Sequence, residues 1–321
     1  MPQVTVLMPV YNAMPFLPMA VESVLAQTLS AFELLIVDDG STDGTCAYLE
    51  SLRDDRIRIL KRTHEGLGAT LNAGIDLCKT EYIARMDGDD VIHPRRLEAQ
   101  LEYLIEYPHI CMVGCQVEFL VRVPTGLVAR VPTEHNEIVQ RLLAGKSGIS
   151  HATLMMRSSV VRRSGGYRIA GPHGDLDFCL QMCEAGQAAN LAGVYYFYRL
   201  LPSSVSLSRR SDMRLEYAYA VESAKRRRTR SPEPNFESFR TQWGQRNRIK
   251  RLVDVLEDWA TWMYRLSIID RAEGRPVRGY IRLLSAAAAQ PHWCAWHLRQ
   301  LAKYWINGAN RSPARASFNP E

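Results

Sequence analysis

Short apolar runs alternate with segments of helical periodicity over the first ninety residues. Four runs rich in branched aliphatic side chains have the composition of buried parallel strands. They span residues 4–9, 32–37, 57–60 and 82–86. The segments between them place apolar side chains three or four positions apart, which predicts helices at 15–27, 46–52 and 67–79. Because strands that alternate with helices form parallel sheets with crossover helices, the pattern predicts an α/β fold.

The pattern after residue 90 is mixed. Helical spacing recurs in four segments, at 94–107, 138–143, 157–163 and 175–185. Extended apolar stretches lie at 111–123, 149–156 and 195–199. A parallel half followed by a mixed half predicts one merged domain, in which the second half supplies the site for a second substrate.

Two of the predicted strands end in acidic segments. Residues 38–43 follow the second strand, and residues 87–90 follow the fourth. The carboxyl ends of parallel strands meet at one edge of the sheet, where α/β proteins bind ligands. The chain has neither a GxGxxG fingerprint nor a GxxxxGK[ST] loop, so a bound phosphate needs a bridging cation. Carboxylate oxygens suit Mg²⁺ or Mn²⁺, and the alternative is a solvated acidic turn.

Charge divides the chain near residue 210. Residues 1–210 hold 20 Lys and Arg against 23 Asp and Glu, whereas residues 211–321 hold 20 against 11. The second region is helical in pattern, with helices expected at 276–289 and 293–305. It carries all six tryptophans, five of them within residues 259–305. Amphipathic helices with Trp and Arg favour a membrane surface. They equally suit packing on the body or a homo-oligomer contact, a solvated helical face stays open, and nucleic acid is less favoured.

Compartment is indicated by the cysteines and the start of the chain. The seven cysteines form no CxxC and no zinc-ligand spacing, and the first residues lack the features of a secretory leader. Reduced thiols in a cytosolic compartment are therefore expected. No window of eighteen apolar residues predicts a transmembrane helix. The expectation is a cytoplasmic protein, with peripheral attachment to the inner face of a membrane left open.

Several motifs together resemble family 2 glycosyltransferases, which have the GT-A fold. The matching segments include MPVYN (8–12), FELLIVDDGSTDGT (32–45), LNAGI (71–75), YIARMDGDD (82–90), ISHATLMMR (149–157) and GDLDFCLQMCEAG (174–186). They lie within about the first two thirds of the chain. The resemblance implies a Rossmann-like nucleotide-binding sheet merged with a mixed acceptor-side half in residues 1–210. Residues 211–321 would form a basic, Trp-rich helical C-terminal region.

The resemblance also assigns the donor side of the site. Nucleotide contacts are implied for eight residues at three strand ends: Pro9, Val10, Tyr11, Asn12, Asp38, Asp39, Asp87 and Gly88. Tyr11 would stack on the nucleobase, with a core aromatic as the alternative, and Asp39 would accept a hydrogen bond from a base N–H. Asp89 would bind the Mn²⁺ or Mg²⁺ that bridges the two phosphates, and Asp90 would contact the sugar or support the metal.

The catalytic base is placed at Asp175 by the same resemblance. Its carboxylate would take the proton of the acceptor hydroxyl as that oxygen attacks the sugar in a single displacement, which inverts the anomeric configuration. Asp177 is the less favoured candidate, because two residues along a helix start it would point elsewhere and cap the helix or pair with an arginine. Weaker contacts with donor or acceptor are implied for His151, Arg199 and Asn72, and a structural role for His151 is the alternative.

Three positions depart from the family pattern. Gly174 replaces the acidic residue that usually precedes the base, Leu71 replaces a cationic residue, and Leu201 replaces a histidine. The sequence therefore predicts a metal-dependent inverting transfer from a nucleoside-diphosphate sugar, with a UDP-sugar favoured. The acceptor would be a saccharide or a lipid-linked glycan in surface polysaccharide synthesis. A catalytically weak nucleotide-sugar-binding or partner-binding protein is the main alternative, and a phosphohydrolase is a distant third.

Overall fold

The computed structural model describes residues 1–168, 174–202 and 210–290. The helix expected at 293–305 lies outside these residues. The chain forms two compact units. The first comprises residues 1–117, 129–198 and 213–236, and the second comprises residues 118–128, 199–212 and those from 237 onward. This division differs from the boundary expected after residue 210, because residues 213–236 belong to the first unit.

A parallel sheet begins the first unit, as the apolar runs predict. Strands β1 (Val4–Val10), β2 (Phe32–Asp38), β3 (Ile57–Lys61) and β4 (Tyr82–Arg85) are parallel, in the order β3-β2-β1-β4. The sheet continues with β8 (Met155–Arg157), which is antiparallel to both β4 and β6 (Ile110–Leu120). Strand β9 (Gln187–Arg199) follows β6 and pairs antiparallel with the short β5 (Val91–Ile92). The predicted change from a parallel to a mixed half is thereby confirmed.

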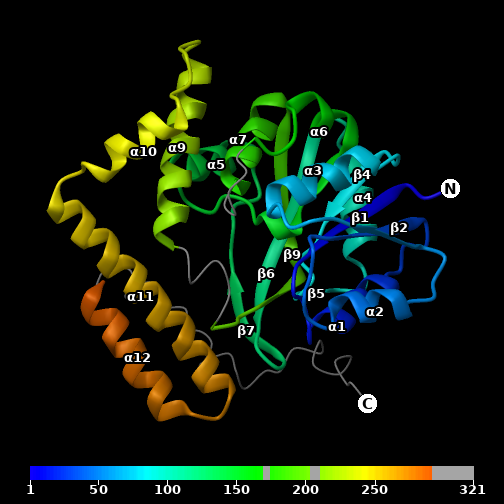
Figure 1. Ribbon diagram of the computed structural model, residues 1–321, viewed down its shortest axis with the longest axis horizontal. Coiled ribbons are helices and arrows are strands. Elements are labelled where there is room, and N and C mark those ends of the chain that lie inside the picture. The colour runs from blue at the N-terminus through cyan, green and yellow to red at the C-terminus, as the bar shows by residue number, and fades with distance from the viewer. Residues whose placement is uncertain (169–173, 203–209, 291–321) are drawn as a thin grey trace. The chain divides into compact units, whose positions relative to one another are not determined.

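Helices cover both faces of this sheet (Figure 1). One core joins strand residues to α1 (Leu17–Leu25), α2 (Thr45–Ser51) and α4 (Arg96–Glu106). The opposite core joins them to the helices of the other layer. These are α3 (Leu67–Leu77), α5 (His135–Leu143), α6 (Ser158–Ser164), α7 (Asp175–Ala185) and the first-unit part of α9 (Arg210–Arg228).

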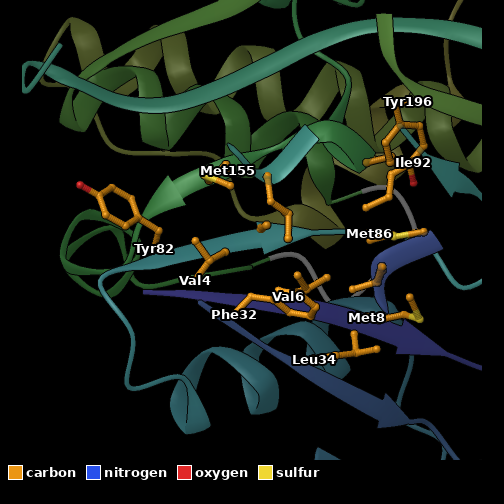
Figure 2. Packing of buried hydrophobic residues seen from close by; sticks show 14 of the residues in the cluster. Val4, Val6, Met8, Phe32, Leu34, Tyr82, Met86, Ile92, Met155 and Tyr196 are labelled. Carbon is orange, nitrogen blue, oxygen red and sulfur yellow. The ribbon is translucent and has the colours of Figure 1, made fainter. Parts of the chain in front are cut away.

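Strand β1 serves both cores because its side chains alternate in direction. Val4, Val6 and Met8 are fully buried in the first core (Figure 2), whereas Leu7 is buried in the second. All seven residues of β1 are buried. This explains why the strand reads as a continuous apolar run rather than as an alternation of apolar and polar residues.

The mixed half differs in detail from the sequence pattern. Strand β7 (Pro124–Ala129) pairs with β6 and was not expected as a separate strand. Strand β9 begins at Gln187, eight residues before the expected start, because Ala188, Ala189 and Asn190 are buried although they are poor strand formers. The stretch 149–156 is wrong as an extended segment, because a 3₁₀ turn occupies His151–Thr153 and leaves only β8 as strand.

The described part of the second unit is mainly helical. It contains most of α10 (Phe236–Gly244), with α11 (Arg248–Ala272) and α12 (Pro276–Ala289), which pack together as a hairpin. Gly274 turns the chain between the two long helices at φ +78°. Asp270 is buried on α11, and Arg282 of α12 lies 2.9 Å from its carboxylate. Within the described residues, no helix has the length and apolarity needed to cross a membrane.

Candidate active site

The turn after β2 is closed by Asp38. Its Oδ1 accepts hydrogen bonds from the Ser41 amide at 3.0 Å and the Ser41 hydroxyl at 2.6 Å, and its Oδ2 accepts one from the Cys46 thiol at 3.1 Å. The side chain is buried. These bonds hold the first acidic segment in a fixed shape and leave Asp39 as the neighbouring carboxylate at the strand end.

Asp39 is held by the loop between β3 and α3. The amides of Glu65 and Gly66 donate to its two carboxylate oxygens at 3.0 and 2.9 Å, and His64 Nδ1 lies 2.8 Å from Oδ2. The imidazole of His64 also stacks on Tyr11, with ring centroids 4.1 Å apart. Tyr11 is 46% exposed, so the core-aromatic alternative for this residue is wrong. His64 therefore joins the two side chains expected to hold a nucleobase.

The end of β1 is tied to the same turn. Val10 accepts a hydrogen bond from the Asp39 amide at 2.9 Å, and Asn12 Oδ1 accepts one from the Thr42 amide at 2.7 Å. Pro9 lies opposite Val37 of β2 in the parallel register. The first four predicted nucleotide residues therefore lie beside Asp38 and Asp39, at the carboxyl edge of β1 and β2.

The second acidic segment lies against the end of β1. A Cβ atom on Gly88 would lie 2.7 Å from Val10 Cγ1, so the absence of a side chain allows this close approach. Asp87 forms an ion pair with the buried Arg85, and its amide donates to the Tyr196 hydroxyl at 3.2 Å. Asp87 and Asp89 are half-buried, whereas Asp90 is buried. The structure thus brings both acidic segments together at one edge, as the parallel topology predicts.

Asp175 is the first residue of α7. Its Oδ1 accepts a hydrogen bond from the Leu176 amide at 2.9 Å, and its Oδ2 accepts one from the Tyr217 hydroxyl at 3.1 Å. Burial raises the pKa of Asp175 to about 6, and the hydrogen bond from Tyr217 and the charge of Arg85 limit that rise. A carboxylate with such a pKa is largely ionised at neutral pH and is a stronger base than an ordinary aspartate.

Asp177 has a different environment from Asp175. The Arg168 guanidinium donates to both of its carboxylate oxygens, at 2.9 Å to Oδ1 and 3.2 Å to Oδ2. Gln181 donates to Oδ2 at 2.8 Å, and the side chain is buried. The expectation that Asp177 pairs with an arginine is confirmed, so its carboxylate serves packing and charge pairing.

His151 and Asn72 bind the loop that precedes α7. His151 Nε2 lies 2.6 Å from the Tyr167 hydroxyl, and Asn72 exchanges two hydrogen bonds of 2.9 Å with the Tyr167 backbone. Burial lowers the pKa of His151 well below its ordinary value, which keeps the imidazole neutral. In this arrangement both side chains position Tyr167, and contact with a donor or acceptor sugar stays a prediction.

Arg199 belongs to the second unit. Its guanidinium donates to the Val121 carbonyl at 3.2 Å, and the residue is buried. The expected contact between Arg199 and the diphosphate stays a prediction.

The sequence analysis assigned no role to four residues at or near the site: His64, Arg85, Tyr167 and Tyr217. Arg85 is the most central, because it pairs with Asp87 and acts electrostatically on His151 and Asp175. An arginine within a buried strand could have indicated such a role, because a buried guanidinium requires a partner. His64 and Tyr217 lie in segments whose composition is ordinary for a loop and a helix.

Comparison with known proteins decides the family. The model of "Glycosyl transferase family 2" matches residues 5–164. EpsE of Bacillus subtilis, a protein named as a glycosyltransferase, is 33% identical over 235 residues, which cover 70% of this chain and 80% of that protein. The chain belongs to glycosyltransferase family 2.

Other glycosyltransferases extend the family comparison. The O-antigen biosynthesis glycosyltransferase WbnJ of Escherichia coli is 29% identical over 214 residues, 64% of this chain and 82% of the relative. Among solved structures, TarS 1-349 of Staphylococcus aureus in complex with UDP-GlcNAc has a TM-score of 0.59 at 14% identity. That match covers 90% of this chain and 92% of TarS 1-349.

An archaeal structure has a similar fold. The mannosyltransferase PcManGT of Pyrobaculum calidifontis, in complex with GDP-Man and Mn²⁺, has a TM-score of 0.52 at 17% identity. The match covers 98% of this chain and 82% of the PcManGT chain. The chain is a glycosyltransferase with the GT-A fold, and the mixed α/β architecture expected from its sequence is confirmed.

One departure of this family 2 enzyme from the usual pattern, at Leu71, has a structural explanation. Leu71 is buried in the core that contains α3, so its side chain fills the protein interior. Gly174 is buried immediately before α7, and its carbonyl accepts the Phe178 amide of the first helical turn. Leu201 lies in the second unit and is half-buried.

The donor set of this family 2 enzyme fits an ion that is shared with substrate. In the described parts of the chain, no group of three or more His, Cys, Asp or Glu side chains is arranged to hold a metal by itself. Mg²⁺ and similar ions commonly bind proteins through one or two carboxylates and take further ligands from phosphates and water. The half-buried Asp87 and Asp89, in a turn beside the proposed nucleotide edge, match that mode of binding.

Proposed function

We propose that this enzyme transfers a sugar from a nucleoside-diphosphate sugar to an acceptor hydroxyl, with a UDP-sugar as donor and inversion at the anomeric carbon. The observation that carries the proposal is that the carboxylates lie in three different environments. Asp39 contacts His64, which stacks on the exposed ring of Tyr11. Asp87 and Asp89 follow β4, on the other side of β1, and Asp175 has a raised pKa. A nucleobase, a diphosphate with its cation and an acceptor hydroxyl each require one of these environments.

In the proposed reaction the chain's residues bind, orient and move one proton. Tyr11 offers its ring to the base, and Asp39 accepts a base N–H. Asp89, with Asp87 near it, would hold Mn²⁺ or Mg²⁺, which supplies Lewis-acid stabilisation of the departing diphosphate when bound. Asp175 accepts the proton of the acceptor hydroxyl while its oxygen bonds to the anomeric carbon and the bond to the diphosphate breaks. One displacement inverts the configuration.

The deciding experiment combines nucleotide binding with turnover. Calorimetry with UDP and GDP, each with Mn²⁺, Mg²⁺ or EDTA, should show metal-dependent binding, and UDP is expected to bind more tightly. Release of nucleoside diphosphate from a panel of UDP-sugars and GDP-mannose should then require Asp175. Equal, near-zero turnover by wild type and Asp175→Asn, with nucleotide binding intact, would favour the binding protein instead. Steady phosphate release from sugar phosphates would favour the phosphohydrolase.

We also propose a role in the synthesis of a surface polysaccharide or lipid-linked glycan. The name of WbnJ places that relative in O-antigen biosynthesis. Transfer of labelled sugar to extracted lipid-linked glycan, compared with free monosaccharide, tests the acceptor class. Efficient transfer to free monosaccharide alone would contradict this assignment.

The second unit is proposed to contact an anionic lipid surface. Helix α11 exposes Leu252, Leu256, Trp259 and Trp262, and α12 exposes Val277, Ile281 and Leu284. The exposed cations Arg248, Lys250, Arg251 and Arg278 lie on the same two helices, which gives the combination of apolar and basic side chains that binds anionic interfaces.

A vesicle experiment tests the lipid contact. The full chain should sediment with phosphatidylcholine vesicles that contain phosphatidylglycerol, and much less with phosphatidylcholine alone. Leu252→Glu combined with Leu256→Glu should weaken this sedimentation, whereas Ile105→Glu, at an exposed position of α4 in the first unit, should not. Light scattering that shows self-association lost in the double variant, without any lipid binding by wild type, would assign the surface to a second copy of the chain.

A further inference from the structure

Helix α9 reaches the proposed catalytic base. The Tyr217 hydroxyl of α9 donates to Asp175 Oδ2, on the first residue of α7, at 3.1 Å. The other carboxylate oxygen, Oδ1, accepts a hydrogen bond from the Leu176 amide within the same helix. Tyr217 therefore holds Asp175 from a different helix, 42 positions further along the chain.

Helix α9 is itself fixed against α7. Ala220 and Ala224 are buried in the core that contains Leu176, Leu180 and Cys183 of α7. The Tyr217 side chain is itself packed against this core. The position of Tyr217 is consequently determined by packing and does not depend on its single hydrogen bond.

An ion-pair cluster holds the end of α9 to the same helix. The cluster consists of Arg168, Asp177, Glu184, Arg227 and Glu233. Arg227 lies 2.7 Å from Glu184 at the end of α7 and 3.0 Å from Glu233 in the chain that follows α9. Arg168 joins Glu233 to Asp177, at 3.1 and 2.9 Å. The buried Asp177 and four partly exposed charges thus connect α9 to α7 on both sides of the second turn of α7.

We propose that Tyr217 is a positioning residue for Asp175, and that the ion-pair cluster holds α9 in the place where its hydroxyl can orient that carboxylate. The inference rests on the proposed role of Asp175 as base. Helix α9 is then part of the catalytic unit, although its basic composition suggested that it belonged to the C-terminal region.

The protonation states near Asp175 make the idea measurable. Burial raises the pKa of Tyr217 and Tyr167 well above the usual value, and burial does the same for Cys179 on α7. Burial lowers the pKa of the Arg85 guanidinium, but the ion pair with Asp87 outweighs this effect. The pKa of Arg85 is raised overall, so the side chain stays charged. The pKa of His151 is lowered by burial. Between pH 5.5 and 8, Asp175 is therefore the group of this set that titrates.

The test is the pH dependence of kcat/KM for Tyr217→Phe. Loss of a donor to the ionised carboxylate raises the pKa of Asp175, so the midpoint of the acidic limb should rise by roughly one pH unit. The matched control is Tyr219→Phe on the same helix, because its hydroxyl donates to the Pro234 carbonyl at 3.1 Å instead. Tyr219→Phe should keep the midpoint of wild type. An unchanged midpoint in Tyr217→Phe, with UDP affinity intact, would overturn the proposal.

A double variant tests the positioning role of Tyr217 separately from the role of Asp175 as base. If Tyr217 acts through Asp175, adding Tyr217→Phe to Asp175→Asn should cost no further activity, whereas independent roles would multiply the two losses. Full activity of Asp175→Asn alone would refute the base assignment, and with it the proposed mechanism. Loss of activity in Asp175→Asn, with additive loss in the double variant, would refute only the positioning role of Tyr217.

Discussion

The donor edge and the base of this enzyme are held in different ways. Asp38 and Asp39 accept hydrogen bonds from backbone amides and short side chains in their own turn and in the next loop. Asp175 depends on a hydroxyl from a helix that follows the whole sheet in the chain. The donor edge is therefore encoded in short motifs, whereas the base is assembled only when distant segments pack.

The largest effect is expected from Asp175→Asn. Removing a general base should lower kcat by roughly a thousandfold, within the range for such groups, while UDP affinity stays near that of wild type. The measurement is turnover with saturating donor, beside calorimetry of UDP. Asp76→Asn, at an exposed position of α3, is the control and should retain full activity. A loss of less than tenfold would contradict the role of Asp175.

The same variant should show that the ionised carboxylate of Asp175 lowers the stability of the folded protein. The folded-state pKa of about 6 exceeds the ordinary aspartate pKa of 3.8, so the proton stabilises the fold below pH 3.8, and this contribution is lost as pH rises through 6. Asp175→Asn removes this partly buried charge and should therefore melt at a higher temperature than wild type at pH 8, but not at pH 4. Calorimetric melting at both values checks this, and an equal shift at both would contradict it.

On the donor edge, Asp89→Ala should be the most damaging change. Loss of a carboxylate ligand should weaken Mn²⁺-dependent binding of UDP by about a hundredfold, which corresponds to ~2.7 kcal/mol. Calorimetry with Mn²⁺ and with EDTA measures the difference. Asp55→Ala changes an exposed aspartate away from this turn and should leave binding intact. Identical affinity of Asp89→Ala and wild type in Mn²⁺ would remove Asp89 from the metal site.

The pH profile of the unmodified enzyme gives the next effect. Asp175 must be ionised to accept a proton, so kcat/KM should rise about tenfold per pH unit below a midpoint near 6 and level off above it. UDP affinity should change much less over the same range, because UDP is proposed to contact Asp39 and Asp89 at the donor edge and not Asp175. A midpoint near 4 would show that burial does not raise the pKa of the base.

The smallest effect is expected from His64→Ala. The imidazole takes the face of Tyr11 and one oxygen of Asp39 that a nucleobase would use, so its removal should tighten UDP binding about threefold. That factor corresponds to ~0.6 kcal/mol, a usual value for a half-exposed side-chain contact. His109→Ala changes an exposed histidine elsewhere and serves as control. Weaker binding by His64→Ala would instead make the imidazole a wall of the base pocket.

Local periodicity was sufficient to predict most of the sheet and helices. Strands β1, β2 and β4 were predicted because both faces are covered, so nearly every residue is apolar. Strands β5 and β7 could not be predicted in this way. The first has only two residues, and the second is only half-buried and contains a proline and a glycine, which are poor strand formers.

The candidate site was predictable to the extent that its contacts are local. The placement of Asp39 and Asp89 at the same edge of the sheet follows from the parallel strands, which the alternation of strands and helices indicates. The contact between His64 and Asp39 spans 25 positions, and the one between Tyr217 and Asp175 spans 42. Neither His64 nor Tyr217 belongs to a periodic or acidic pattern, so only the packed fold reveals their partners.

The two-sided burial of β1 restricts where this chain can change in length. Leu7 and Met8 are neighbours in sequence but belong to opposite cores. Deleting or inserting one residue within residues 4–10 would exchange the side chains of the two helix layers and displace Tyr11 from the strand end. Insertions should therefore be tolerated in surface connections such as the exposed residues 144–147, and hardly at all in this strand.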